Sequence, residues 1–106
     1  MDKHAIDTLF GVIQSRKGAD PETSYTAKLF AKGRKKIAQK VGEEAVETAL
    51  AAMAEGPEGV ASESADLLYH LLVLWAEMGV APDDVWAELN RRAGVSGIAE
   101  KNSRPK

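Results

Sequence analysis

Two pairs of acidic residues have the types and spacing of a metal-binding site. Glu44 and Glu47 occur in the string GEEAVE, and Glu63 and Asp66 occur in ESADLLYH. Each pair is separated by three positions, so on a helix both carboxylates project from one face, about one turn apart. Their neighbours are mostly apolar, and like charges beside a core repel each other and lose hydration. A hard divalent cation with oxygen ligands removes both penalties, so these four residues are predicted to bind Mg²⁺.

Basic residues precede the first acidic pair and indicate which kind of ligand would bind together with the metal ion. Five of them lie within nine positions: Lys32, Arg34, Lys35, Lys36 and Lys40. A polyphosphate with its metal ion needs basic residues for the phosphate oxygens and acidic residues for the metal ion. A cluster of basic residues is also typical of a solvated helix face. Lys40 lies one turn before Glu44, where it would contact a phosphate or form an ion pair with Glu44. Arg34 and Lys36 are either further phosphate contacts or surface charges.

Two other polar residues lie beside the acidic pairs. Glu43 adjoins Glu44 but projects about 100° away from it around a helix. It would either orient an attacking water molecule or be solvated. His70 follows Asp66 by four positions and shares its helical face. We expect it to support Asp66 from behind the metal site, as the outer partners of metal ligands commonly do, rather than to take part directly in catalysis.

Composition limits the class of protein. A chain of 106 residues with 44% hydrophobic and 28% charged residues is typical of one globular domain. Aromatic residues make up only 6%, while Ala and Leu are frequent, which favours helices. With no cysteine, no apolar leader and no long apolar stretch, a cytoplasmic protein without a membrane partner is expected. The net charge of −2 gives no general attraction to nucleic acid.

Apolar spacing and helix-breaking residues predict an all-α fold of about five helices. The expected ranges are 4–16, 25–32, 33–55, 59–78 and 82–92, within a domain of residues 1–94. Residues 95–106 are expected to form a weakly structured tail. Ile37, Val41, Ala45, Ala49 and Met53 are the expected apolar contacts of the third helix. Gly42 lies inside this helix at a cost of about 1 kcal/mol relative to Ala, which suggests close approach of a backbone or a ligand.

The spacing between the acidic pairs predicts how they meet. Fifteen residues separate Glu47 from Glu63, enough to end one helix, turn, and begin an antiparallel neighbour. The two acidic pairs would then face each other across the helix–helix contact. The helix at 59–78 is apolar on more than one side, more than a chain of this size readily covers. We therefore expect a homodimer in which helices 33–55 and 59–78 of two chains form a four-helix-bundle core.

Longer strings of this sequence are similar to a known family. The runs SYTAKLFAKG, KKIAQKVGEEAVETALAA and ESADLLYHLLVLWAEMGVAPDDVWAELNRR resemble the phosphoribosyl-ATP pyrophosphatase family, over roughly residues 5–93. The two acidic motifs alone would indicate only the wider all-α nucleoside triphosphate pyrophosphatases, which include MazG-like and dimeric dUTPase-like enzymes. The strings SYT, KVGEEA and ADLLYHLL are more specific. The resemblance implies Mg²⁺-dependent hydrolysis of phosphoribosyl-ATP to phosphoribosyl-AMP and pyrophosphate, the second step of histidine biosynthesis.

The resemblance also implies roles for individual residues. Glu44, Glu47, Glu63 and Asp66 would be the metal ligands. Together with the position of Glu43 beside Glu44, this gives Glu43, Glu44 and Glu47 as the expected catalytic residues. Tyr25 and Thr26 would contact the substrate, although helix capping and packing also explain them. Two alternatives remain: a house-cleaning pyrophosphatase that acts on free nucleoside triphosphates, and a non-enzymatic dimeric helical module whose acidic pairs keep it in solution.

Overall fold

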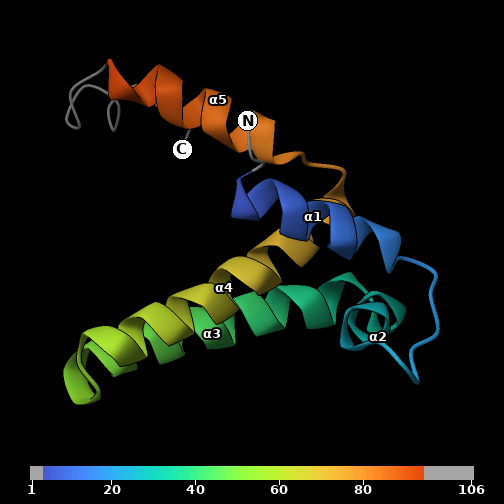
Figure 1. The fold of residues 1–106 in the computed structure, drawn as a ribbon, viewed down its shortest axis with the longest axis horizontal. Coiled ribbons are helices and arrows are strands. Elements are labelled where there is room, and N and C mark those ends of the chain that lie inside the picture. Colours follow the sequence, from blue (N-terminus) through green and yellow to red (C-terminus); the bar gives the residue numbers. More distant parts are fainter. Residues whose placement is uncertain (1–3, 95–106) are drawn as a thin grey trace.

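A computed structural model describes residues 4–94 as five α-helices. Figure 1 shows the order α1 (Ala5–Ser15), α2 (Tyr25–Lys32), α3 (Arg34–Ala54), α4 (Pro57–Met78) and α5 (Pro82–Ala93). The described range contains no strand, so the prediction of an all-α fold is confirmed. The predicted tail, 95–106, lies outside the described residues. None of the helices within 4–94 is long and apolar enough to cross a membrane.

The two longest helices, α3 and α4, form an antiparallel hairpin. Gly56 connects them with a φ of 82°, a left-handed conformation that suits glycine. Pro57 then occupies the first position of α4. The predicted start of this helix at residue 59 is therefore wrong by two residues. Proline is favourable at the first helical position, where a backbone N–H has no partner in the helix to lose.

The hydrophobic core lies at one end of this hairpin, where α1 and α2 cover it (Figure 1). Its most deeply buried side chains are Ile13 from α1, Ile37 from α3, and Leu72 and Val73 from α4. Leu29 of α2 completes the contact. At the other end, the turn between α3 and α4 projects away from α1 and α2.

The buried face of α3 confirms the prediction at Ile37 and differs from it further along the helix. Ile37, Glu44 and Ala51 are buried at intervals of seven residues, whereas Ala45 and Ala49 are exposed. Met53, expected among the core contacts, is 87% exposed. Both sets of positions follow a helical period, so the pattern alone did not reveal which face the rest of the chain would cover. The exposed set leaves an apolar surface on α3.

Candidate active site

Three carboxylates from the two hairpin helices meet in one cluster. Glu44 of α3 and Glu63 and Asp66 of α4 each place a carboxylate oxygen within 4.8 Å of the others. The antiparallel packing of α3 and α4 brings the two acidic segments together, as their spacing predicted. Glu44 is buried, Glu63 is half-buried and Asp66 is exposed. The cluster therefore extends from the interior to the solvent, where a ligand can reach it.

Glu63 carries the clearest sign that this cluster lacks a partner. Its Oε2 atom is buried and has no hydrogen-bond partner among the described residues. Burial, followed by the charges of Glu47 and Asp66, raises the pKa of Glu63. A buried carboxylate oxygen without a partner is costly, and a divalent cation would satisfy it while offsetting the repulsion. The chemistry of the donor set therefore fits such an ion.

Glu47 lies next to the cluster of three rather than within it. Its side chain is exposed. Burial, then a hydrogen bond to Glu47 and the charge of Glu47, raise the pKa of Glu44. The same charge acts on Glu63. Glu47 is thus close enough to affect both carboxylates, and its role as a fourth ligand stays a prediction.

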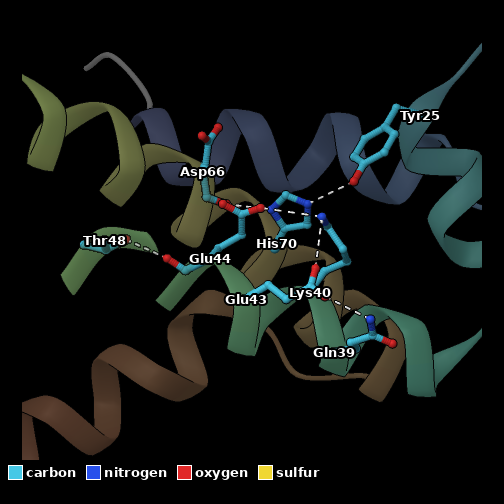
Figure 2. Close-up of polar contacts among 8 residues, drawn as sticks. All are labelled: Tyr25, Gln39, Lys40, Glu43, Glu44, Thr48, Asp66 and His70. Atoms are coloured by element: carbon cyan, nitrogen blue, oxygen red, sulfur yellow. Dashed lines mark hydrogen bonds and ion pairs between the residues drawn. The ribbon is translucent and has the colours of Figure 1, made fainter. Parts of the chain in front are cut away.

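Lys40 and Glu43 form a polar network on the α3 side of the cluster (Figure 2). The Lys40 Nζ atom lies 3.3 Å from Oε1 of Glu43 and 3.7 Å from Oε1 of Glu44. The hydrogen bond to Glu43 raises the pKa of Lys40. Gln39 donates a second hydrogen bond to Glu43, at 2.9 Å. The bonds from Gln39 and Lys40 lower the pKa of Glu43, so this exposed carboxylate is held in its anionic form.

The other basic candidates lie at different distances from the cluster. Lys36 is half-buried one turn before Lys40, on the same face of α3. Arg34 instead pairs with Glu77 near the end of α4, at 3.7 Å between Nε and Oε2. Ten residues of helix, about 15 Å, separate Arg34 from Glu44. Lys36 is therefore close enough to Glu43 for its charge to lower the pKa of that carboxyl, whereas Arg34 pairs with Glu77.

His70 supports Asp66 through the main chain. The buried ring places Nδ1 2.8 Å from the carbonyl oxygen of Asp66, not from its carboxylate. On the other side of the ring, Nε2 lies 3.2 Å from the hydroxyl of Tyr25 (Figure 2). The ring therefore contacts the backbone of Asp66 rather than its carboxylate, and its support of a metal ligand stays a prediction.

The three hydroxyl residues at the start of α2 differ in their surroundings. Ser24 caps the helix, since its Oγ accepts a hydrogen bond from the Ala27 N–H at 3.1 Å. Thr26 is 9% exposed and bonds to the hydroxyl of Tyr69. Tyr25 is 52% exposed. Packing thus accounts for Thr26, while the ring of Tyr25 remains open to a ligand. Sequence reasoning missed Tyr69, although its place beside His70 in ADLLYHLL was a signal.

An open groove of about 550 Å³ runs along α3, and Glu47, whose charge acts on the acidic cluster, is among the residues that line it. It is lined by Gln39, Gly42, Glu43, Val46 and Glu47. A Cβ atom placed on Gly42 would meet nothing within 4 Å. The expectation that a backbone closely approaches Gly42 is therefore wrong for this chain taken alone. The glycine widens a groove that is open to a ligand or a second chain.

Facing carboxylates on an antiparallel helical hairpin, with a lysine beside them, are the arrangement that the acidic motifs of the sequence associate with all-α nucleoside triphosphate pyrophosphatases. Comparison with known proteins makes the assignment specific. The family model described as Phosphoribosyl-ATP pyrophosphohydrolase matches residues 6–93, and the chain belongs to this family. The resemblance found in the sequence is thus confirmed.

Similar proteins from several organisms carry names that match this family. A protein from Paramagnetospirillum magneticum named phosphoribosyl-ATP pyrophosphatase is 65% identical over 105 residues, covering 99% of this chain and 96% of the relative. A protein of the same name from Rhodospirillum rubrum is 66% identical, covering 95% and 86%. One from Azospirillum brasilense is 64% identical, covering 93% and 89%. The similarity therefore spans nearly the whole chain.

Proposed function

We propose that this chain hydrolyses phosphoribosyl-ATP to phosphoribosyl-AMP and pyrophosphate, the second step of histidine biosynthesis. Its family and the names of its relatives support the substrate. The structural observation that carries the proposal is the cluster of Glu44, Glu63 and Asp66, in which a buried Glu63 oxygen has no described partner. Such a cluster suits a divalent cation, and a polyphosphate substrate brings the oxygen atoms that complete a cation's coordination.

The cation in this proposal is Mg²⁺, held by Glu44, Glu47, Glu63 and Asp66. When bound, it would neutralise charge on the phosphate oxygens and favour ionisation of the attacking water. The residues of the chain supply the remaining functions. Lys40, whose pKa is raised chiefly by its hydrogen bond to Glu43, stays cationic and contacts a phosphate beside Glu44.

Glu43 orients the attacking water in this proposal. The hydrogen bonds from Gln39 and Lys40 lower the pKa of Glu43, so its carboxylate is ready to accept a hydrogen bond from water. Glu43 and Glu47 both line the open groove, where water and substrate have access. Glu44 and Glu47, from the same helix, would contribute to catalysis by holding the cation.

The other predicted substrate contacts have unequal support. Lys36 shares the face of Lys40, which supports a second phosphate contact. The half-exposed ring of Tyr25 also leaves surface for a substrate. Arg34 is paired with Glu77, and Thr26 is bonded to Tyr69, so the geometry gives these two less support.

The proposal also includes a homodimer. Val46, Leu50 and Met53 are 58%, 61% and 87% exposed and form an apolar stripe on α3. This stripe continues from the groove beside the carboxylates, since Val46 belongs to both. A second copy of the hairpin would cover it. A cytoplasmic location and the absence of a nucleic-acid partner stay predictions from the sequence.

A substrate comparison tests this function directly. Pyrophosphate release would be measured from phosphoribosyl-ATP, ATP, dUTP and dCTP, each with Mg²⁺ and with the metal chelated. We expect release from phosphoribosyl-ATP above all, and only with Mg²⁺. Preference for a simple triphosphate would indicate a house-cleaning pyrophosphatase. No hydrolysis of any of them would favour a non-enzymatic helical module.

A further inference from the structure

A line of hydrogen bonds connects α2 to the acidic cluster. The hydroxyl of Tyr25, in the first turn of α2, lies 3.2 Å from Nε2 of His70. The Nδ1 atom of the same ring lies 2.8 Å from the main-chain oxygen of Asp66. His70 also stands edge-on to the rings of Tyr25 and Tyr69, with centroid distances of 6.0 and 5.0 Å. Both nitrogens and both neighbouring rings therefore fix the histidine.

The hydrogen-bond partners of His70 determine which ring nitrogen carries the proton. A carbonyl oxygen only accepts hydrogen bonds, so the Nδ1 atom of His70 must carry the proton donated to Asp66. In the neutral ring, Nε2 is then an acceptor, and the hydroxyl of Tyr25 donates to it. The bonds run in one direction, from Tyr25 through His70 to the backbone of Asp66. Each bond holds the next in its geometry.

We propose that Tyr25 is a positioning residue that acts through His70 to hold the helical turn carrying Asp66. With that turn fixed, the Asp66 carboxylate stays within reach of Glu44 and Glu63 when a cation binds. This inference rests on the proposed function, because it takes Asp66 as a cation ligand. It gives Tyr25 a role that requires no contact with the substrate.

A neighbouring hydrogen bond provides the matched control. The hydroxyls of Thr26 and Tyr69 also join α2 to α4, one position along each helix from Tyr25 and His70. The described contacts of the Tyr69 hydroxyl do not extend to Asp66. Tyr25→Phe and Tyr69→Phe thus each remove one hydroxyl bond between the same two helices. Only the first removes a bond that leads to the acidic cluster.

Titration with Mn²⁺ in the absence of substrate tests the proposal. The dissociation constants of the wild type, Y25F and Y69F would be measured by calorimetry, with urea unfolding of each protein beside them. We expect Y25F to weaken Mn²⁺ binding about tenfold, the lower end for partners behind metal ligands. Y69F should change it less than twofold, even where both variants lose similar stability.

Each alternative outcome is decisive. Equal weakening in Y25F and Y69F would mean that docking of α2 matters in general, which overturns the proposed role. Unchanged binding in Y25F, with a wild type that binds Mn²⁺, overturns this inference alone. A wild type that binds no Mn²⁺ overturns the proposed metal site, and this inference with it.

A second measurement does not require any variant to fold. In the metal-free wild type, ¹⁵N NMR at a pH where the ring is neutral reports which nitrogen of His70 carries the proton. We expect the proton on Nδ1. A proton on Nε2 would leave Nδ1 unable to donate to Asp66 and would overturn the proposal.

Discussion

At the residue scale, a substitution of Glu47 distinguishes a metal-binding role from a structural one. Its side chain is exposed, so replacing it should disturb folding little, yet its charge reaches both Glu44 and Glu63. We expect Glu47→Gln to lower kcat/KM with phosphoribosyl-ATP more than 100-fold, since ligands of a catalytic metal contribute several kcal/mol to transition-state stabilisation. Steady-state kinetics at saturating Mg²⁺ would measure this loss.

The control for Glu47 is Glu58→Gln, which also removes one exposed carboxylate, in the first turn of α4. Its activity should stay within twofold of the wild type. If Glu47→Gln retains activity comparable to this control, Glu47 has no part in binding the metal.

The acidic cluster also predicts how the stability of the metal-free protein depends on pH. Burial and neighbouring charges raise the pKa of Glu63 above the ordinary value of 4.5. At pH values between the ordinary pKa and the raised pKa, the folded state binds more protons than the unfolded state. The free energy of unfolding therefore falls as pH rises through this range. The contribution of Glu63 to the free energy of unfolding is fully present below pH 4.5 and is lost as pH passes through the raised pKa.

Urea unfolding of the wild type and Glu63→Gln across this pH range measures the effect. With the metal chelated, we expect the wild type to lose stability relative to Glu63→Gln as pH rises. Added Mg²⁺ should reverse the trend in the wild type only, because cation binding stabilises the folded state. A difference between the two proteins that does not vary with pH would contradict the raised pKa.

At the element scale, the cap of α2 is a local feature formed by the residue immediately before the helix. The Ser24 Oγ accepts a hydrogen bond from the Ala27 N–H, at 3.1 Å. We expect Ser24→Ala to lower the free energy of unfolding by about 1 kcal/mol. Chemical denaturation would measure it beside Ser62→Ala, an exposed position within α4 that should change stability by less than about 0.5 kcal/mol. Equal effects would mean that the cap does not stabilise α2.

Local signals explain how much of the fold the sequence predicted. Helix bounds follow from caps, prolines and apolar spacing within a few neighbouring residues, so α2 matched its predicted range, 25–32. The meeting of Glu44, Glu63 and Asp66 also follows from spacing, because one turn between antiparallel helices brings their acidic segments together. These features depend on little beyond the two segments themselves.

Contacts that depend on the rotation of one helix against another were not predictable in this way. The pairing of Arg34 with Glu77, between α3 and α4, and the contact of His70 with the Tyr25 hydroxyl, between α4 and α2, both depend on it. So does the burial of Glu44 and Ala51 in place of Ala45, Ala49 and Met53. Sequence spacing gives the faces of each helix, but only packing decides which face is covered.

At the scale of the whole molecule, the apolar stripe of Val46, Leu50 and Met53 lies on α3, the helix that carries Glu44 and Glu47. The groove beside the carboxylates is continuous with this stripe through Val46. A second hairpin packed there would cover the apolar side chains and also form a wall of the groove. In the proposed dimer, activity would therefore depend on dimerisation.

The variant Leu50→Glu tests that coupling. A glutamate in the middle of the stripe would have to lose its hydration in the dimer, so we expect a monomer near 11.4 kDa where the wild type has about twice that mass. The matched control is Val12→Glu on α1, where an apolar residue of 44% exposure lies outside the stripe. Light scattering after gel filtration would measure the masses, and pyrophosphate release at the same concentrations would measure activity.

Three results are distinguishable, because mass and activity are read from the same samples. If the partner completes the groove, Leu50→Glu loses both the dimer and most of its activity, and Val12→Glu loses neither. A monomeric Leu50→Glu that stays fully active would mean that each chain holds a complete site. A wild type that is itself a monomer would contradict the dimer, and the exposed stripe would then need another explanation, since such surfaces usually mark an interaction.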